Sequence, residues 1–346
     1  MARPLPSTDL DLILHATETL WEPVRGQRIF ITGGTGFFGC WLVESFCHIN
    51  RALNLNASAT VLTRSPTNFI SKAPHLAADP HIHLLAGDVR GFKFPDGEFH
   101  FVIHAATEAS ARQAAEAPLE MLSTILTGTE RTLEFAATHG TGRFLLTSSG
   151  AVYGRQPSSI THLPESYVGA PNPLDPSSVY AEGKRAAELM CSLYQRKAGI
   201  ECAIARCWAF CGPHLPLDAH FAIGNFIGNA LRKEPISIQG DGTPRRSYLY
   251  GADLAIWLWT MLFRAPSLTP INVGSGEDLS ILELAQKVAK TLDTDAVIQV
   301  AGSPSPGSAP SRYVPSVSRA KQLLGLEQTV SLEESIRRTA AWYRAQ

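Results

Sequence analysis

The sequence predicts an α/β fold in which a doubly wound parallel sheet is joined to a smaller C-terminal lobe. Short apolar, β-branched runs recur in the N-terminal part of the chain, and helical stretches follow several of them. A glycine-rich turn follows the first run, and side chains suited to proton transfer follow the fifth. A chain of 346 residues can also bury a sizeable core and suits two lobes.

The first predicted strand, residues 28–32, runs directly into a glycine-rich turn, and an apolar helical stretch follows at 40–49. Strand, turn and helix in this order are the context in which a glycine motif binds a dinucleotide. The first glycine permits a tight turn, the second lets the backbone approach a pyrophosphate, and the third lets the helix pack closely. The helix N-terminus adds N–H donors for the same anion. The predicted cofactor contacts here are Gly33, Gly36, Phe37, Phe38 and Gly39.

The second predicted strand, residues 59–63, ends at Arg64. Sites for NAD usually hold the free ribose 2′-hydroxyl with an acidic residue near this point, and residues 60–70 contain no Asp or Glu. A guanidinium suits a 2′-phosphate, because its planar fork can donate two hydrogen bonds. Arg64 therefore favours NADP over NAD, although an exposed arginine without a ligand explains the sequence almost as well.

The third and fourth predicted strands supply further cofactor contacts. Residues 82–85 are followed by Asp88 and Val89, which we assign to the adenine side of the site. The segment at 103–107 (IHAAT) ends the fourth strand and places Ala105 and Ala106 near the nicotinamide ribose. Ligands of open α/β sheets lie at the carboxyl ends of the strands, which is where these residues fall.

The fifth predicted strand, residues 143–147, leads to Ser149, and a helical run to Lys197 opens with Tyr180 and Lys184. Because the tyrosine and lysine are four residues apart, they share one helix face. A nearby ammonium and a positively charged nicotinamide are expected to lower the pKa of Tyr180 from its reference value of about 10. Tyr180 could then exchange a proton with a hydroxyl while hydride moves. Ser149 would bind the same oxygen, and Lys184 would also hold the nicotinamide ribose.

A Tyr/Lys pair at helical spacing is more often a solvated face than a catalytic one. Its combination with a serine at a strand end and a glycine turn upstream favours catalysis. With the glycine turn, the serine, the tyrosine and the lysine in this order, the chain resembles the extended short-chain dehydrogenase/reductases of the NAD-dependent epimerase/dehydratase family, which act on nucleotide-activated sugars. The resemblance is carried by TGGTGFFG at 32–39, GDV at 87–89, IHAAT at 103–107, LTSSGAVYG at 146–154, YAEGK at 180–184 and GDGTPRRSYLY at 240–250.

This resemblance implies a Rossmann-like fold, a bound NADP or NAD and a nucleotide-diphosphate sugar as substrate. It implies Ser149, Tyr180 and Lys184 as the catalytic residues. It also implies that Arg246 and Arg312 contact the substrate diphosphate, with Asn225 beside it. Arginine suits a diphosphate because it donates bidentate hydrogen bonds. For either arginine alone, an exposed surface position explains the sequence about as well as a contact with the diphosphate does.

Two departures from the family pattern bear on the reaction. Sugar 4,6-dehydratases usually carry an Asp-Glu pair just after the catalytic serine or threonine, and the related decarboxylases carry a Glu. Here Gly150 and Ala151 stand at these positions, and neither can act as an acid or base. Ala209 replaces an Asn that often contacts the diphosphate, which leaves substrate identity more open.

We therefore expect hydride transfer at C4 of a nucleotide-activated hexose, with 4-epimerisation as the leading reaction. The alternative is an NADPH-dependent reductase of a 4-keto-6-deoxy sugar, which Arg64 would favour. A 4,6-dehydratase or a decarboxylase fits less well because of Gly150 and Ala151. A non-catalytic dinucleotide-binding protein fits least, because the serine, tyrosine and lysine are all present.

The predicted organisation is an N-terminal extension (1–26), a dinucleotide-binding domain (27–210, with 245–275 returning to it) and a substrate lobe (211–244 and 276–346). The extension precedes the point where members of the family usually begin. It carries apolar residues at helical spacing, which predicts an amphipathic helix packed on the body, with partner binding less favoured: Leu10, Ile13, Leu14, Thr17 and Leu20.

Composition and sequence pattern argue against several other classes of protein. The net charge of −1 gives no electrostatic reason to bind nucleic acid or an acidic membrane. We see no signal peptide, and no run approaches the roughly 20 apolar residues that span a bilayer. The six cysteines contain no C-x-x-C, so free thiols in a reducing cytoplasm are expected. His81 and His83 lack partners at ligand spacing, so no metal site is expected.

Two helices also carry apolar stripes that predict a homodimer. Residues 119–137 form one stripe, and the helix that opens at Tyr180 forms the other. In relatives, the equivalent helices pair across a two-fold axis into a four-helix bundle. Alternatively, both stripes face their own sheet, and the pattern does not separate these arrangements.

Overall fold

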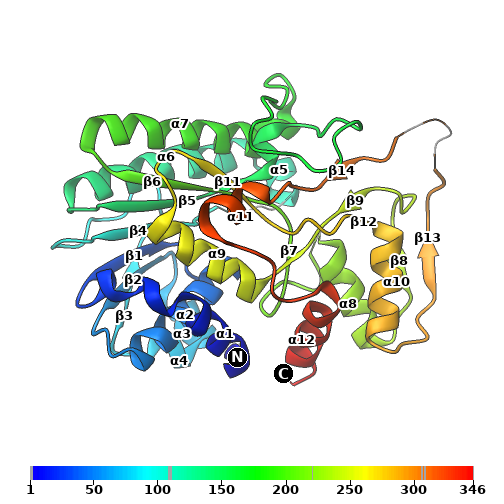
Figure 1. The fold of residues 1–346 in the computed structure, drawn as a ribbon, viewed down its shortest axis with the longest axis horizontal. Coiled ribbons are helices and arrows are strands. Elements are labelled where there is room, and N and C mark those ends of the chain that lie inside the picture. Colours follow the sequence, from blue (N-terminus) through cyan, green and yellow to red (C-terminus); the bar gives the residue numbers. More distant parts are fainter. Residues whose placement is uncertain (1–2, 108–110, 220, 305–306, 308, 346) are drawn as a thin grey trace.

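A parallel sheet forms the centre of the larger lobe (Figure 1). The computed structural model describes residues 3–107, 111–219, 221–304, 307 and 309–345. Within these residues the sheet has seven strands: β1 (Arg28–Thr32), β2 (Ser58–Thr63), β3 (Ile82–Ala86), β4 (Phe101–His104), β5 (Arg143–Ser149), β6 (Glu201–Cys207) and β11 (Pro270–Val273). Their order is β11-β6-β5-β4-β1-β2-β3, so the chain winds outward from β1 in both directions. This confirms the predicted doubly wound α/β fold.

Helices cover both faces of this sheet (Figure 1). One layer contains α2 (Phe37–Ala52) and α9 (Gly251–Arg264), and the opposite layer contains α6 (Pro118–Thr138) and α7 (Val179–Ala198). Side chains alternate along a strand, so successive residues of β1 pack against opposite helix layers. Ile29 packs with α2 and α9, and Phe30 packs with α6 and α7. Shorter helices complete the layers: α3 (Pro66–Lys72), α4 (Pro74–Ala77), α5 (Ala111–Glu116) and α11 (Ser318–Leu324).

Strand register brings the predicted site residues to one edge of the sheet. Thr32 of β1 pairs with His104 of β4, and His104 pairs in turn with Leu146 of β5. The segments that follow these strands therefore leave the sheet side by side. This arrangement juxtaposes the glycine turn after β1, the segment after β4 and Ser149 at the end of β5.

The smaller lobe is built from short strand pairs and helices. Its helices are α8 (Ala222–Arg232), α10 (Ile281–Thr291) and α12 (Leu332–Arg344). Its strands form separate small sheets: β8 (Ile236–Ile238) with β13 (Ile298–Val300), and β9 (Arg245–Arg246) between β12 (Leu279–Ser280) and β14 (Arg312–Tyr313). A further pair, β7 (Phe210–Cys211) and β10 (Leu249–Tyr250), lies near the junction with the larger lobe. Ile227, Leu284 and Ile336 are fully buried in the core of this lobe.

The N-terminal segment forms helix α1 (Ser7–Thr17), followed by the 3₁₀ turns η1 (Glu18–Leu20) and η2 (Glu22–Val24). Helix α1 packs against α2 and α9, with Ile13 and Thr17 buried in the interface. The charged residue Asp9 is also fully buried. Its carboxylate accepts hydrogen bonds from the Tyr250 hydroxyl and from Arg338 Nη1, both at 2.6 Å. Asp9 thus links α1 to a strand and to the last helix. Residues 1 and 2 of the predicted extension lie outside the described residues.

The two helices of the predicted dimer interface lie side by side on one face of the sheet (Figure 1). Leu133, Ala136 and Ala187 are buried against their own sheet, as in the alternative arrangement. Leu189 and Leu193 of α7 are more than half exposed. Dimerisation therefore stays a prediction. Among the described residues, no helix has the length and apolar character required to span a membrane.

Candidate active site

The turn between β1 and α2 leaves no room for a side chain at its first and last glycines. Gly33 has a positive φ of +73°, and a Cβ there would lie 2.4 Å from the carbonyl carbon and oxygen of Ala105. A Cβ on Gly39 would lie 2.3 Å from the carbonyl oxygen of Gly33. Both positions therefore require glycine, the first for its backbone conformation and both for close approach.

The space beside Gly36 fits the diphosphate of a dinucleotide. Gly36 is the N-cap of α2, and no side chain caps this helix. A Cβ on Gly36 would meet only the carbonyl oxygen of Gly33, at 3.6 Å. Helix α2 begins at Phe37 rather than at the predicted Cys40, so Phe37 and Phe38 belong to the first turn. The N–H groups of that turn can bind an anion, which fits the expected NAD(P).

The adenine side of the site contains a pairing that the sequence did not suggest. Asp88 accepts hydrogen bonds from Arg90 through both carboxylate oxygens, each at 2.8 Å. This bidentate pair lowers the pKa of Asp88 to about 2. Arg64 follows β2 and is exposed. Val89 is buried and lies against Gly128, where a Cβ would lie 2.8 Å from Val89 Cγ1.

Ala105 and Ala106 lie where β4 leaves the sheet, against the glycine turn. The N–H of Ala105 donates to the carbonyl oxygen of Thr32, and the N–H of Ala106 donates to Thr32 Oγ1, both at 3.2 Å. These bonds hold the segment after β4 on the end of β1. The segment after it contributes Thr107, whose hydroxyl donates to the Ala106 carbonyl at 2.8 Å.

The structure brings Ser149, Tyr180 and Lys184 together at the carboxyl edge of the sheet. Ser149 ends β5, and its Oγ accepts a hydrogen bond from the N–H of Ala151 at 3.1 Å. The Ser149 side chain lies beside the Tyr180 phenol and acts to lower its pKa. Lys184 lies one turn further along α7, with Nζ 5.9 Å from the centre of the Tyr180 ring.

Lys184 is held by hydrogen bonds to two groups other than the Tyr180 hydroxyl. Its Nζ donates to Thr107 Oγ1 at 3.0 Å and to the carbonyl oxygen of Thr147 at 2.7 Å. Burial lowers the pKa of Lys184 to about 8. We expected the pKa of Tyr180 to be lowered, but burial raises it to about 12, and Ser149 only partly opposes this effect. Without a cofactor, desolvation therefore exceeds the effect of the neighbouring protein groups. The lowering of the Tyr180 pKa beside a bound nicotinamide stays a prediction.

Behind these residues, an ion pair that the sequence analysis missed ties β5, β6 and α7 together. Arg206 donates to both carboxylate oxygens of Glu188, at 3.0 and 2.7 Å. The Ser148 hydroxyl donates to the same carboxylate at 2.5 Å. Glu188 follows Lys184 by one helical turn, and this spacing was the one sequence signal for its inward position.

A wall of aromatic residues faces the backbone at Gly150. The Trp208 ring packs on Tyr313 with centroids 4.3 Å apart, and its Nε1 donates to Asn272 Oδ1 at 3.1 Å. Asn272 also accepts from the Tyr153 hydroxyl at 2.9 Å. A Cβ on Gly150 would lie 2.7 Å from the Trp208 ring and 2.9 Å from the Tyr313 hydroxyl. No side chain therefore fits at position 150 without displacing this wall.

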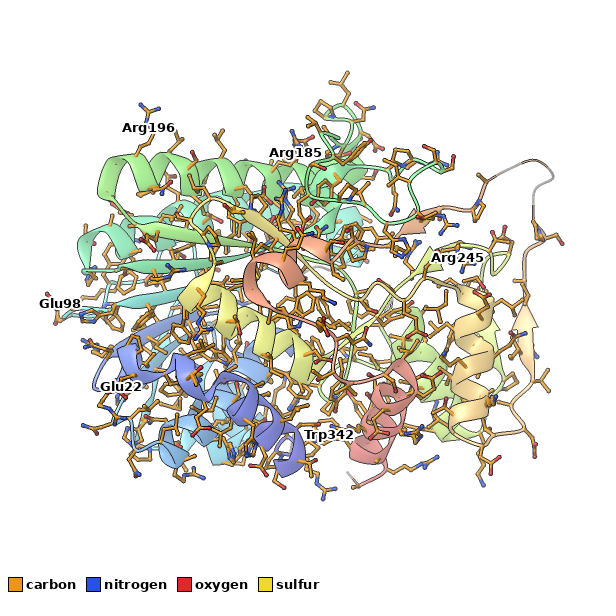
Figure 2. All side chains as sticks on the ribbon, viewed as in Figure 1. Glu22, Glu98, Arg185, Arg196, Arg245 and Trp342 are labelled. Atoms are coloured by element: carbon orange, nitrogen blue, oxygen red, sulfur yellow. The ribbon has the colours of Figure 1, made fainter. Side chains whose placement is uncertain are left out.

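The loop that follows Gly150 is fastened to α7. It begins with the 3₁₀ turn η3 (Gly150–Tyr153), and a second turn, η4 (Pro176–Ser178), leads into the helix. Arg185 projects from α7 toward this loop (Figure 2). Its Nη1 donates to the carbonyl oxygens of Val152 and Gly169, both at 3.1 Å. This arginine therefore holds the loop beside the helix that carries Tyr180 and Lys184.

The two predicted diphosphate arginines lie on neighbouring strands but on opposite faces. Register pairs Arg246 with Tyr313 and Arg245 with Arg312, and adjacent strand residues point to opposite sides. Arg246 therefore shares the face of Tyr313, and its guanidinium carbon lies 6.0 Å from the centre of that ring. Arg312 forms an ion pair with Asp278, which also accepts from Arg245 Nε at 2.7 Å. Arg246 is thus on the catalytic side, and Arg312 has a protein partner.

Asn225, the third predicted substrate contact, lies on α8 of the smaller lobe. Its Oδ1 is buried and has no hydrogen-bond partner among the described residues. A buried amide oxygen left unpaired is costly, so a polar ligand is the expected partner of this amide.

Comparison with known proteins identifies the family. Residues 29–274 match the model of the NAD dependent epimerase/dehydratase family. The chain belongs to this family. It is an NAD(P)-dependent enzyme of the extended short-chain dehydrogenase/reductase type, as its resemblance implied.

Relatives within the family differ in their reactions. UDP-glucuronic acid decarboxylase 1 of Arabidopsis thaliana is 33% identical over 92% of this chain and 70% of its own length. The UDP-glucose 4-epimerase of Thermus thermophilus in complex with NAD is 25% identical, with a TM-score of 0.75 over 92% of this chain and 99% of that one. DesIV, a dTDP-glucose 4,6-dehydratase of Streptomyces venezuelae, shares the fold with a TM-score of 0.76 at 24% identity, over 92% of this chain and 97% of that one.

Proposed function

We propose that this protein oxidises C4 of a nucleotide-activated hexose and then reduces it from the opposite face, a 4-epimerisation. Tyr180 is the acid/base: its phenolate takes the proton of the C4 hydroxyl, and its phenol returns a proton after reduction. Ser149 hydrogen-bonds the same oxygen and keeps it beside the phenol. When bound, the nicotinamide supplies hydride chemistry at C4. Lys184 holds the ribose beside it, and the two opposite hydride transfers leave no net redox change.

The absence of an acidic residue at the two positions after Ser149 carries this proposal. Elimination and decarboxylation in this family are assisted by carboxylates at the two positions after the catalytic serine or threonine. In this chain, Ala151 is apolar, and a Cβ on Gly150 would collide with Trp208 at 2.7 Å. The remaining machinery supports proton exchange at one oxygen and hydride transfer at its carbon.

The substrate would lie between the sheet edge and the smaller lobe. Arg246 is on the face of Tyr313 and can donate to a diphosphate. Asn225 could donate to it through Nδ2, whereas its unpaired Oδ1 needs a donor such as a sugar hydroxyl. Arg312 could join them only by giving up part of its pairing with Asp278. We therefore assign Arg246 and Asn225 as the main diphosphate contacts and keep Arg312 as a secondary one.

A second candidate is the NADPH-dependent reduction of a 4-keto-6-deoxy sugar nucleotide, which the exposed Arg64 at the end of β2 favours. The substitution Arg64→Ala tests the cofactor part of this argument. If the guanidinium holds a 2′-phosphate, the variant should bind NADPH about tenfold more weakly, with NADH binding unchanged. Titration of each cofactor by fluorescence measures both affinities. Unchanged NADPH affinity would remove the case for NADP.

The reaction itself is tested by product analysis. The purified protein is denatured and any released nicotinamide is identified by mass spectrometry. The native protein is then incubated with UDP-glucose, with UDP-glucuronic acid and with a dTDP-4-keto-6-deoxyhexose, and products are read by NMR. Inversion at C4 without net cofactor change, together with a cofactor that survives purification, supports the epimerase.

Other products would change the assignment. Stoichiometric consumption of added NADPH with the keto sugar would indicate the reductase. A uronic acid oxidised at C4 is a β-keto acid that can lose carbon dioxide, so a pentose product from UDP-glucuronic acid would indicate the activity named for the Arabidopsis relative. Ser149→Ala is the control that should reduce any of these activities, since each begins or ends with proton exchange at C4.

A further inference from the structure

The carboxylate of Glu188 accepts three hydrogen bonds behind the catalytic residues. Its Oε1 accepts from the Ser148 hydroxyl at 2.5 Å and from Arg206 Nε at 3.0 Å, and its Oε2 accepts from Arg206 Nη2 at 2.7 Å. The side chains of Glu188 and Arg206 are only 13% and 15% exposed, so little water competes for these bonds. The proposed mechanism gives Glu188 no role, although it follows Lys184 by one helical turn.

Strand register explains why these three groups meet. Ser148 of β5 pairs with Arg206 of β6, so their side chains leave the sheet on the same face. Leu146, two residues before Ser148, is buried in the layer that contains α6 and α7, so this is the face that α7 covers. Glu188 reaches both side chains from α7 and joins the helix to the two strands.

The end of β5 extends past one of its neighbours. Strand β4 pairs with β5 as far as Leu146, whereas β6 pairs with it as far as Ser149. Residues 147–149 therefore continue beyond the strand pairing on the β4 side. Side chains have to hold this segment where a strand does not, and the bond from the Ser148 hydroxyl to Glu188 is one such contact.

The same segment carries an acceptor of the Lys184 ammonium. Lys184 Nζ donates to the carbonyl oxygen of Thr147 at 2.7 Å. This carbonyl belongs to the peptide group that joins Thr147 to Ser148, and a peptide group is planar. A rotation of Ser148 would therefore turn the carbonyl away from Nζ. Because the bond to Glu188 opposes that rotation, Glu188 is connected to Lys184 through one side chain and one peptide group.

We propose that Glu188 is a positioning residue, which acts through Ser148 to keep the Thr147 carbonyl directed at the Lys184 ammonium. This inference rests on the proposed role of Lys184 in holding the nicotinamide ribose. A hydrogen bond to a charged group favours the charged form, so a well-placed Thr147 carbonyl also helps Lys184 to keep its proton. No proton leaves Glu188 in any step.

The other titratable groups that face Lys184 are uncharged at neutral pH. Burial lowers the pKa of His104, on β4, to about 3 and raises the pKa of Cys207, on β6, to about 12. On α7 itself, the pKa values of Cys191 and Tyr180 lie above their ordinary values. None of these groups changes its charge near neutral pH, so they do not obscure a change in the titration of Lys184.

The test compares Ser148→Ala with Glu188→Gln. Ser148→Ala breaks the link to the peptide group but keeps the ion pair of Glu188 with Arg206, so no buried charge is left unpaired. Glu188→Gln removes the same link and also the charge. Glu182→Gln is the matched control on the same helix, because a third of the Glu182 side chain is exposed and it pairs with Arg185 instead.

The readout is the protonation of Lys184 in the protein without cofactor or substrate. In protein labelled with ¹³C at the lysine ε carbon, the Lys184 signal is assigned with Lys184→Arg and followed against pH. Burial lowers the pKa of Lys184 to about 8, so the wild-type signal should titrate near pH 8. The midpoint should fall by about one pH unit in Ser148→Ala, the shift expected when a hydrogen bond to a charged group is lost.

In Glu188→Gln the midpoint should fall at least as far, and in Glu182→Gln it should equal that of wild type. An unchanged midpoint in Ser148→Ala would overturn the proposal, because Glu188 would then act by its charge alone or not at all. A shift of the same size in Glu182→Gln would also overturn it. If Glu188→Gln does not fold because Arg206 has lost its charged partner, Ser148→Ala and its control still decide.

A double-mutant cycle tests whether the two residues act along one path. If Glu188 acts through Ser148, Ser148→Ala should cause no further shift in a Glu188→Gln background. Full additivity of the two shifts would overturn the proposal.

This titration is independent of the proposed reaction. If the midpoint shifts as expected but the wild-type protein forms no C4 epimer, the proposed function fails and the positioning role stands. If C4 is inverted but the midpoint does not move in Ser148→Ala, the positioning role fails and the proposed function stands.

Discussion

In the proposed mechanism, Tyr180 has to lose a proton in a place where burial opposes its ionisation. Burial raises its pKa to about 12, and only Ser149 acts in the other direction. The ammonium of Lys184 is directed to Thr107 and to the Thr147 carbonyl instead. The phenol therefore stays protonated at neutral pH in the protein alone. Because the proposed base is the phenolate, Tyr180 would have to lose this proton to solvent before it takes the proton of the C4 hydroxyl, and a bound positive charge would favour that loss.

Tyr180→Phe should reduce turnover at least a hundredfold, within the range of roughly 10²–10⁴ for removal of a general acid or base. The ring and the helix are retained, so affinity for the cofactor should stay nearly unchanged. Steady-state kinetics measure the first quantity, and fluorescence titration with NAD⁺ or NADP⁺ measures the second. Full activity in this variant would exclude Tyr180 as the acid/base.

Lys184 should produce an alkaline limit on activity. Burial lowers its pKa from 10.5 to about 8, so the folded protein loses the ammonium near pH 8. We expect the rate to fall as pH rises through about 8 in wild type. In Lys184→Arg, which stays charged, the fall near pH 8 should disappear even if the rate is lower overall. An identical alkaline limb in both proteins would assign it to another group.

The lowered pKa of Lys184 has the opposite effect on the stability of the fold. Between pH 8 and 10.5 the unfolded chain holds the Lys184 proton and the folded protein does not. The unfolded state binds more protons there, so this group makes the free energy of unfolding rise with pH across that window. Catalysis and stability therefore respond to Lys184 in opposite directions.

At the scale of elements, sequence rules that involve only neighbouring residues predicted the positions of many residues of the candidate site. Strand ends, a glycine turn and four-residue helical spacing place Ser149, Gly33, Tyr180 and Lys184 correctly at one sheet edge, because each rule depends on neighbouring residues. The start of α2 was placed too late, since helix signals at Phe37 are weak without a side-chain cap. Helix α1 was expected to bury apolar residues, and the buried Asp9 was not foreseen.

Contacts between distant strands could not be predicted in this way. The pairing of Arg312 with Asp278 and the stacking of Tyr313 on Trp208 depend on β9, β12 and β14 meeting. These strands are two residues long, which is too short for a hydrophobic period to identify. The face on which each arginine lies follows from register, and the sequence does not reveal register between such short segments.

Two glycines allow the free-energy cost of backbone strain to be compared with the cost of a close contact. Gly33 and Gly26 have similar positive φ values, +73° and +67°, but a Cβ on Gly26 would have no heavy atom within 4 Å. Gly26→Ala should therefore destabilise the protein by about 1 kcal/mol from strain alone. Gly33→Ala adds a collision with the backbone of Ala105 and should cost about 2–4 kcal/mol. It should also abolish measurable cofactor binding.

Urea unfolding gives the two stability changes, and equilibrium dialysis with NAD⁺ gives the binding. If both variants lost the same free energy and both kept the cofactor, the contact with Ala105 would not matter.

At the scale of the whole molecule, Asp9 connects the first helix to the last. Its carboxylate is fully buried and accepts from Tyr250 and Arg338, both at 2.6 Å. Asp9→Ala leaves a buried hydroxyl and a guanidinium without this partner, so the free energy of unfolding should fall by about 2–3 kcal/mol. Asp11→Ala is the matched control on the same helix, where Asp11 is half exposed and pairs with His48.

The control should change stability by less than about 0.5 kcal/mol. Chemical denaturation with tryptophan fluorescence reports both variants. Equal, small changes in the two would show that α1 is held by its apolar contacts alone.

The packing of α1 on α9 has a consequence for biosynthesis. Helix α1 packs on α2 and on α9, and the α9 part of this interface is complete only when the ribosome has reached Arg264, about 250 residues after Ile13. At translation rates of about 5–20 residues per second, that interval is roughly ten to fifty seconds. The part of the apolar side of α1 that faces α9 is therefore uncovered during this time and is available to chaperones or to another nascent chain. Conditions that slow elongation should raise aggregation of this protein more than conditions that slow its release.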